Sequence, residues 1–151
     1  MLEAVDIRLV WSAIRPGIES IHAGMPWVDW IPEDLYAACI LGDAAVLVKP
    51  DTDPGDSFGV VRMDTNSRSG EKTLFLWIAW CQDKEGADSI YRDLDMLAQN
   101  NGCAAIEFIT GEKKLVEYAQ QFGFKKVMYE VRKELPGPTA PVKMDPEEGT
   151  G

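Results

Sequence analysis

The sequence predicts one α/β domain of the mixed α+β kind, in which a central mixed β-sheet carries helices on both faces. The chain of 151 residues has the usual size of a single domain, and 46% of its residues are hydrophobic. Apolar residues recur every three or four positions before residue 42 and alternate after residue 44, so helices give way to strands. Residues 73–81 are apolar on both alternating sides, and such a strand must be covered on both faces. We expect this domain to span residues 1–135.

Two helices are expected before the first strand. Residues 7–23 carry a helical apolar face, and Pro16 within it predicts a kink or a division into two short helices. The second helix has Pro32 in its first turn, followed by acidic residues that oppose the helix dipole, and Gly42 is placed to end it. Between the two helices, Trp27 and Trp30 lie in a loop, where they either anchor a protein interface or plug the end of the core.

Three strands follow, at residues 44–49, 57–64 and 73–81, separated by segments rich in Pro, Gly, Asp and Ser that predict turns. The third is the strongest strand in the chain, and we expect it to be central. Simple alternation places one set of its side chains on one face of the sheet, namely Leu74, Leu76, Ile78 and Trp80. The other set faces the opposite way, namely Phe75, Trp77, Ala79 and Cys81.

The second half of the chain predicts a helix at 87–100, a strand at 103–110, a helix at 112–122 and a strand at 125–134. The strands at 73–81 and 103–110 should be parallel neighbours, because a helix connects them in the manner of a right-handed crossover. The helices at 87–100 and 112–122 should lie on opposite faces or flanks. Residues 136–151 are acidic and rich in Pro and Gly, so we expect an extended tail that is ordered only by contact with another chain.

From residue 44 onward, this order of elements resembles the GNAT family of acyl-CoA-dependent N-acetyltransferases. The run Gln-Phe-Gly-Phe at 121–124 is similar to the family's helix ending in Gly-Phe before its last strand. The run Asn-Gly-Cys-Ala-Ala-Ile-Glu at 101–107 is similar to a segment of small GNAT-like proteins of tailed bacteriophages. The resemblance covers residues 8–135 and implies a GNAT-like fold, with acetyl-CoA as the coenzyme of an active member.

The family's phosphate-binding loop has the pattern Gln/Arg-x-x-Gly-x-Gly/Ala, which corresponds here to residues 82–87. Small residues in that loop let backbone amides turn onto the coenzyme's diphosphate. The residues that the resemblance places against the coenzyme are Gln82, Lys84, Gly86 and Ala87. Glu85 stands at the first glycine position and Asp83 adds a second carboxylate, although acids at a helix start are also ordinary partners of the dipole. We therefore expect acetyl-CoA to bind weakly or not at all, and no cofactor unless the protein is active.

The family's usual general acid is a tyrosine four residues before the glycine of the Gly-Phe pair. That position is Ala119 here, and Tyr118 differs from it by about 100° of helix rotation. Tyr118 is the candidate acid, or else a partly exposed packing residue. Glu107, in the strand after the loop, is the candidate base, or else the polar position of a strand.

Charge and composition argue against several partners. The formal net charge of −10 opposes binding to nucleic acid and to anionic membranes, whose phosphates recruit Lys and Arg. The three cysteines show no metal-type spacing and His22 is the single histidine, so we expect neither a metal site nor a His-dependent triad. The apolar run at 74–81 is too short to span a bilayer, and the N-terminus lacks a signal-peptide pattern. We expect the host cytoplasm or a virion as the location.

These observations support two functional hypotheses. The first is a non-catalytic or weakly catalytic interaction or structural protein, phage-encoded and associated with a virion or its assembly, in which Trp27 and Trp30 contribute to an interface with a protein partner. The alternative is an acetyl-CoA-dependent N-acetyltransferase that acts on an amine of a small molecule or protein. The departures at residues 83 and 85 favour the first, and the order of elements favours the second.

Overall fold

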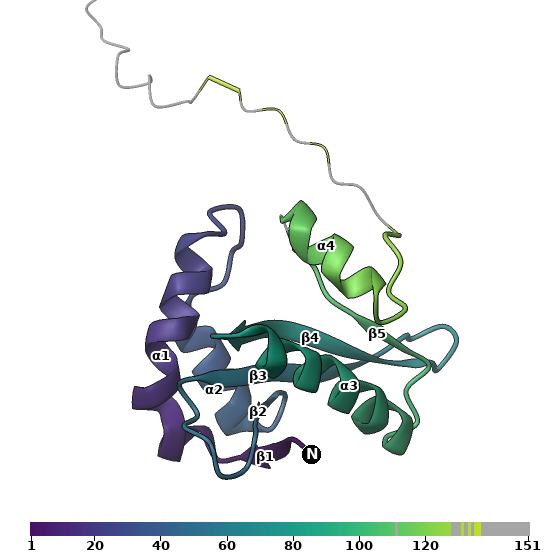
Figure 1. The fold of residues 1–151 in the computed structure, drawn as a ribbon. Helices are drawn as coiled ribbons and strands as arrows, with labels where there is room; N and C mark the ends of the chain where they lie inside the picture. The colour runs from purple at the N-terminus through teal and green to yellow at the C-terminus, as the bar shows by residue number, and fades with distance from the viewer. Residues whose placement is uncertain (111, 128–130, 132, 134, 137–151) are drawn as a thin grey trace, which may run out of the picture.

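The structure is a computed structural model that describes residues 1–110, 112–127, 131, 133, 135 and 136. Within them the chain forms one five-stranded sheet in the order β1-β2-β3-β4-β5 (Figure 1). The strands are β1 (Glu3–Val5), β2 (Ala45–Val48), β3 (Ser57–Thr65), β4 (Lys72–Cys81) and β5 (Ala105–Glu107). The helices are α1 (Ile7–Ala23), α2 (Pro32–Leu41), α3 (Lys84–Asn100) and α4 (Lys113–Gln120). Strands β1 to β4 pair antiparallel in sequence order, and β5 pairs parallel with β4.

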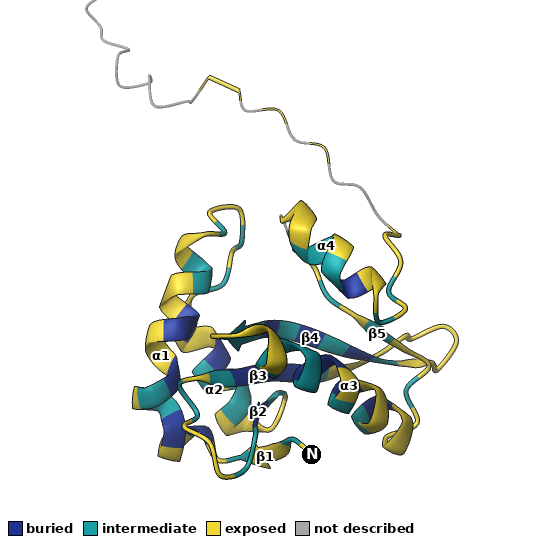
Figure 2. Ribbon diagram, in the orientation of Figure 1, coloured by how far each residue is buried: buried dark blue, intermediate teal, exposed yellow. Residues whose placement is uncertain are grey.

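Two hydrophobic cores lie on the two faces of this sheet. Helices α1 and α2 cover one face, where Ile14, Ile18 and Leu35 pack against Phe58 and other strand residues. Helix α3 covers the other face, where Tyr118 of α4 and the phenylalanines at 122 and 124 join the core. The buried residues follow the inner sides of the helices and the middle of the sheet (Figure 2). The predicted mixed sheet with helices on both faces is therefore confirmed.

The first helix is continuous through its proline. Helix α1 runs for 17 residues with Pro16 inside it, so the predicted division into two short helices is wrong. Pro16 lies on the exposed side, while its neighbour Gly17 is buried against the sheet. A Cβ atom on Gly17 would lie 3.0 Å from the rings of Phe58 and Trp80, which shows how closely α1 approaches the strands. At the end of α2, Gly42 adopts the left-handed conformation with φ of 86°, as predicted.

A β-bulge in β4 changes which side chains face which helices. Val60 is opposite Ile78 but Val61 is opposite Leu76, so Trp77 is an extra residue in β4. A bulge of this kind inverts the alternation beyond it. Before the bulge, Leu74 and Leu76 face α3, and after it Ala79 and Cys81 do. Trp77, Ile78 and Trp80 face α1 and α2 instead, so the simple alternation predicted for residues 73–81 is wrong.

The parallel pairing of β4 with β5 is confirmed, but two details differ from the prediction. The strand predicted at 103–110 is only three residues long. Tyr118 of α4 packs in the core on the α3 side, so the two helices do not lie on opposite faces of the sheet. The strand predicted at 125–134 is not formed over residues 125–127, and most of its remainder, like residues 137–151 of the predicted tail, lies outside the described residues. Across the described part of the chain, no helix is long and apolar enough to cross a membrane.

Candidate functional site

The most distinctive backbone feature is the divergence of β4 and β5. The two strands pair only from Thr73 opposite Ala105 to Phe75 opposite Glu107. Strand β4 then continues to Cys81 while the chain after β5 leads away to α4 (Figure 1). Over the described residues, positions 76–81 of β4 therefore have no strand partner on this side. Such an edge presents backbone amide and carbonyl groups that an extended ligand with amides of its own can pair with, as an added strand does.

Helix α3 begins beside the end of this edge, and its own sequence caps it. Asp83 is the N-cap residue, and its carboxylate accepts a 2.7 Å hydrogen bond from the Gly86 amide. The helix starts at Lys84, three residues earlier than predicted, so Gln82 and Asp83 alone form the connection. The helix starts at this point because aspartate is strongly preferred as an N-cap residue. A Cβ atom on Gly86 would lie 3.2 Å from both the Asp83 carboxylate and the Ser57 hydroxyl, so glycine permits this close approach.

This helix start fits a diphosphate poorly as it stands. An anion bound at a helix N-terminus needs free amide groups, and here the Asp83 carboxylate takes the Gly86 amide. Glu85 lies exposed in the same turn and adds a second negative charge. Lys84 is the cation of this turn, but its amino group lies 3.2 Å from the Asp88 carboxylate. Of the candidate coenzyme-binding residues, Gln82 donates a 3.1 Å hydrogen bond from its backbone N–H to the Asp56 carbonyl. Ala87 lies within the helix.

Tyr118 joins α4 to α3. Its hydroxyl donates a hydrogen bond to the carboxylate of Asp88, which also faces Lys84. Burial, reinforced by this bond to Asp88, raises the pKa of Tyr118 well above its usual range. The hydrogen bond from Tyr118, followed by the contact with Lys84, lowers the pKa of Asp88. Tyr118 is therefore a protonated donor committed to Asp88 at neutral pH, and not a free acid at the edge of β4.

The two candidate catalytic residues do not come together. Tyr118 belongs to the core on the α3 face of the sheet. Glu107 pairs with Phe75 in the β4–β5 ladder, one residue away from the Leu74 and Ile106 pair that faces α3, so it points to the opposite face. It is exposed there. Tyr118 and Glu107 cannot act as an acid–base pair in this arrangement.

An aromatic cluster that the sequence did not predict fills the space between α3 and α4. Tyr91 of α3 stacks on Phe122 with ring centroids 5.1 Å apart and meets Tyr118 edge-on at 5.6 Å. Phe108 and Phe124 complete the cluster. Burial raises the pKa of Tyr91 to about 12. Since these rings come from three separate segments, helical periodicity within any one of them gives no signal of the cluster.

The two loop tryptophans have different environments. Trp30 packs on the core of the α1 and α2 side, edge-on to Trp77 with 6.2 Å between ring centroids, and its ring centroid lies 5.1 Å from that of His22. Of the two alternatives for Trp30, plugging the end of the core is the one that these contacts favour. Trp27 is 40% exposed and stays a candidate for a protein interface.

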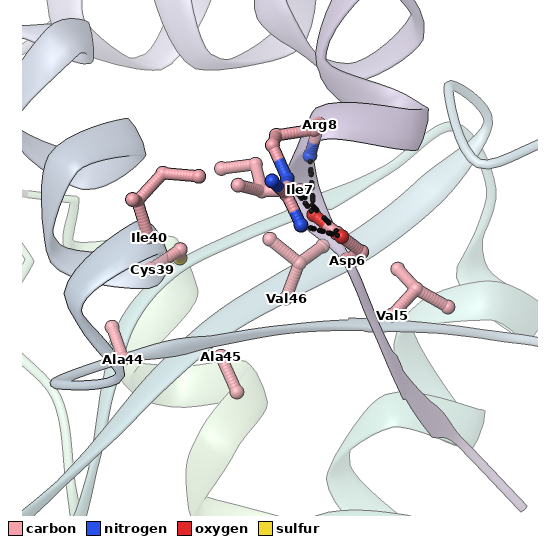
Figure 3. Close-up of a pocket in the computed structure, with 9 residues that line it drawn as sticks. All are labelled: Val5, Asp6, Ile7, Arg8, Cys39, Ile40, Ala44, Ala45 and Val46. Carbon is pink, nitrogen blue, oxygen red and sulfur yellow. Dashed lines mark hydrogen bonds and ion pairs between the residues drawn. The ribbon is translucent and has the colours of Figure 1, made fainter.

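A cleft of about 280 Å³ lies on the opposite side of the molecule, between the start of α1 and the end of α2 (Figure 3). Arg8 and Asp6 line it as a closed ion pair, with 2.7 Å between Nη2 and Oδ2. Cys39 also lines it, and burial raises the pKa of this thiol to about 11, so it is protonated at neutral pH. Neither the paired charges nor the thiol is prepared for catalysis, and the β4–β5 divergence is the better candidate site.

Metal chemistry has no assembled ligand set in the part of the chain that the structure describes. No group of three or more His, Cys, Asp or Glu side chains there could hold a metal ion. The cysteines at 39, 81 and 103 are separate free thiols.

Comparisons with known proteins find the fold but no close relative. No protein-family model matches the chain, and no curated protein matches its sequence. The structure is similar to the ribosomal-protein-alanine N-acetyltransferase of Brucella melitensis biovar Abortus 2308, with a TM-score of 0.63 and 13% identity over 88% of this chain and 99% of that one.

It is also similar to an aminoglycoside acetyltransferase from an uncultured soil metagenomic sample, solved with sisomicin (TM-score 0.65, 7% identity, 90% of this chain and 96% of that one). An acetyltransferase of Trypanosoma brucei matches with a TM-score of 0.61 and 11% identity, over 89% of this chain and 99% of that one. The chain therefore has the fold of the GNAT acetyltransferases. Identities this low establish the fold alone.

Proposed function

We propose that this protein is an acyl-CoA-dependent N-acetyltransferase that binds acetyl-CoA weakly and acts on an amine of a small molecule or protein. The observation that carries the proposal is the divergence of β4 from β5, which leaves residues 76–81 of β4 without a strand partner next to the start of α3. The amides of a coenzyme's pantetheine arm can pair with such an edge. The acetyltransferases named above share this fold over nearly their whole length.

Weak binding follows from the charges at the helix start. A carboxylate about 4 Å from a phosphate costs about 1 kcal/mol even with water-like screening, which is a factor of about 5 in the dissociation constant. Asp83 and Glu85 both lie in this turn. In the reaction, the amine attacks the thioester carbon, the new C–N bond replaces the C–S bond, and the amine's proton passes to the departing thiolate.

Calorimetric titration of acetyl-CoA tests the proposal directly. We expect saturable binding with a dissociation constant above about 10 μM for the unaltered protein. Glu85→Gln should tighten binding about 5-fold, because it removes one charge near the phosphates. The matched control is Glu71→Gln, an equal charge change in the exposed turn before β4, about 30 Å away along the strand. If none of the three proteins binds acetyl-CoA at millimolar concentration, the proposal is wrong.

A second candidate is a non-catalytic protein that uses this fold to bind a protein partner. The occupied helix start of α3 and the exposed Trp27 favour it. The virion or assembly role expected from the phage resemblance belongs to this candidate, and none of the solved structures named above is a virion component. Trp27→Ala should then weaken association with the partner without lowering the melting temperature. A fall in melting temperature would instead assign Trp27 to the core.

A further inference from the structure

Helix α4 depends on few contacts for its position. It has eight residues, fewer than a helix needs to be stable alone in water. Its N-cap residue Glu112 makes no side-chain cap, and Lys113 and Lys114 in its first turn oppose the helix dipole. Ala119 is its single buried residue. Tyr118 joins α4 to α3 through its ring contact with Tyr91 and its hydrogen bond to Asp88, and the aromatic residues after the helix pack beside them.

The Tyr118–Asp88 hydrogen bond joins the two helices that come after the diverging strands. Asp88 lies in the second turn of α3 and Tyr118 in the second turn of α4. Each helix is the next element after one of the diverging strands: α3 begins at Lys84 after β4 ends at Cys81, and α4 begins at Lys113 after β5 ends at Glu107. A ligand that pairs with the free edge of β4 and extends towards the start of α3 would approach the turn of α3 that carries Asp88.

We propose that the Tyr118–Asp88 hydrogen bond is a latch that keeps α4 docked on α3, and that acetyl-CoA binds only when the latch is open. This inference rests on the proposed function. Each oxygen of the Asp88 carboxylate accepts a hydrogen bond, one from the Tyr118 hydroxyl and one from the Lys84 amino group at 3.2 Å. Binding then competes with the closed form, and the apparent dissociation constant equals that of the open form divided by the open fraction.

The latch would add a second cause of weak coenzyme binding to the Asp83 carboxylate at the start of α3. The Asp83 carboxylate accepts the Gly86 amide and the Asp88 carboxylate accepts the Tyr118 hydroxyl, so these polar groups have partners within the protein. A protein closed in more than about nine molecules out of ten would bind coenzyme at least about 10-fold more weakly than its open form does.

The test uses Tyr118→Phe, which removes the hydroxyl but keeps the ring and its contacts with Tyr91 and Phe122. Tyr36→Phe is the matched control, because Tyr36 makes an edge-on contact with Trp11 on the opposite face of the sheet. Hydrogen exchange of the α4 amides measures docking without coenzyme, and calorimetry with acetyl-CoA measures binding. Asp88→Ala is the second variant that breaks the same bond.

We expect the α4 amides to exchange several-fold faster in Tyr118→Phe and Asp88→Ala, with little further increase in the double variant, and no change in Tyr36→Phe. Acetyl-CoA should bind Tyr118→Phe more tightly by about the same several-fold factor. Unchanged exchange in α4 would overturn the latch, as would faster exchange with equal or weaker binding. If the unaltered protein binds acetyl-CoA but Tyr118→Phe binds no better, the latch alone is wrong. If no variant binds, including Glu85→Gln, both the latch and the proposed function are wrong.

Discussion

Replacing Asp83 with alanine removes two functions of one carboxylate at the start of α3. One Asp83 oxygen accepts a 2.7 Å hydrogen bond from the Gly86 backbone amide and so caps the helix. The same oxygen stands where a phosphate of the coenzyme would accept that amide. Asp83→Ala should therefore make the protein less stable and its coenzyme site better. Most substitutions that improve binding by adding new contacts would not lower the stability of the protein at the same time.

The two magnitudes follow from the geometry. Loss of an aspartate N-cap costs about 1 kcal/mol of unfolding free energy, which lowers the melting temperature by roughly 2–4 °C in a domain of this size. Removal of a carboxylate near a phosphate is worth about 1 kcal/mol, so the dissociation constant for acetyl-CoA should fall about 5-fold. Asp83→Asn keeps a good capping side chain without the charge, so it should tighten binding with little loss of stability.

Thermal unfolding and calorimetric titration of the same preparations measure both effects. Asp6→Ala is the control, because Asp6 caps α1 in the same way, accepting the Arg8 amide at 3.0 Å. It should lower the melting temperature without changing acetyl-CoA binding. If Asp83→Ala loses stability as Asp6→Ala does, and acetyl-CoA affinity stays the same, then the capping carboxylate does not compete with the coenzyme and the reasoning fails.

Two further predictions concern the α1 side of the sheet. Gly17→Ala should lower the unfolding free energy by about 1–3 kcal/mol, since its Cβ would lie 3.0 Å from the Phe58 ring; an unchanged melting temperature would show that α1 can shift freely. The side-chain hydrogen bond from Arg8 lowers the pKa of Asp6 to about 2, so the stability it contributes is present above its unfolded pKa and lost as the pH falls through about 2. Arg8→Gln should move the carbon-13 titration of Asp6 up towards 3.8, and an unchanged midpoint would contradict the role of Arg8.

The order of elements could be predicted because most of its signals are local. Residues 73–81 are apolar on both sides, and Gly42 ends α2 in a conformation that glycine favours. Strand β1 was missed because its three residues carry no periodic pattern and form a strand only by pairing with β2. The bulge at Trp77 was missed because it depends on register with β3, which alternation within β4 does not reveal.

The candidate site was less accessible to sequence reasoning than the fold. Residues 82–86 were expected to form a loop, although Asp83 three residues before Gly86 is a recognisable N-cap signal for the helix start that the structure shows. The pairing of Tyr118 with Asp88 joins residues 30 positions apart on different helices. No spacing rule connects such a pair, so it emerges only once both helices are placed on the same face.

The start of α3 also shows why a shared fold does not carry a shared site with it. A helix N-terminus exposes amide groups that must be satisfied, and either a bound phosphate or a side chain of the protein can do this. In this chain the Asp83 carboxylate does so, and Glu85 complements the dipole. Each choice that stabilises the helix without a ligand also competes with an anionic ligand for the same groups. If the proposed function holds, the balance between these two partners, more than the fold itself, decides how tightly acetyl-CoA binds.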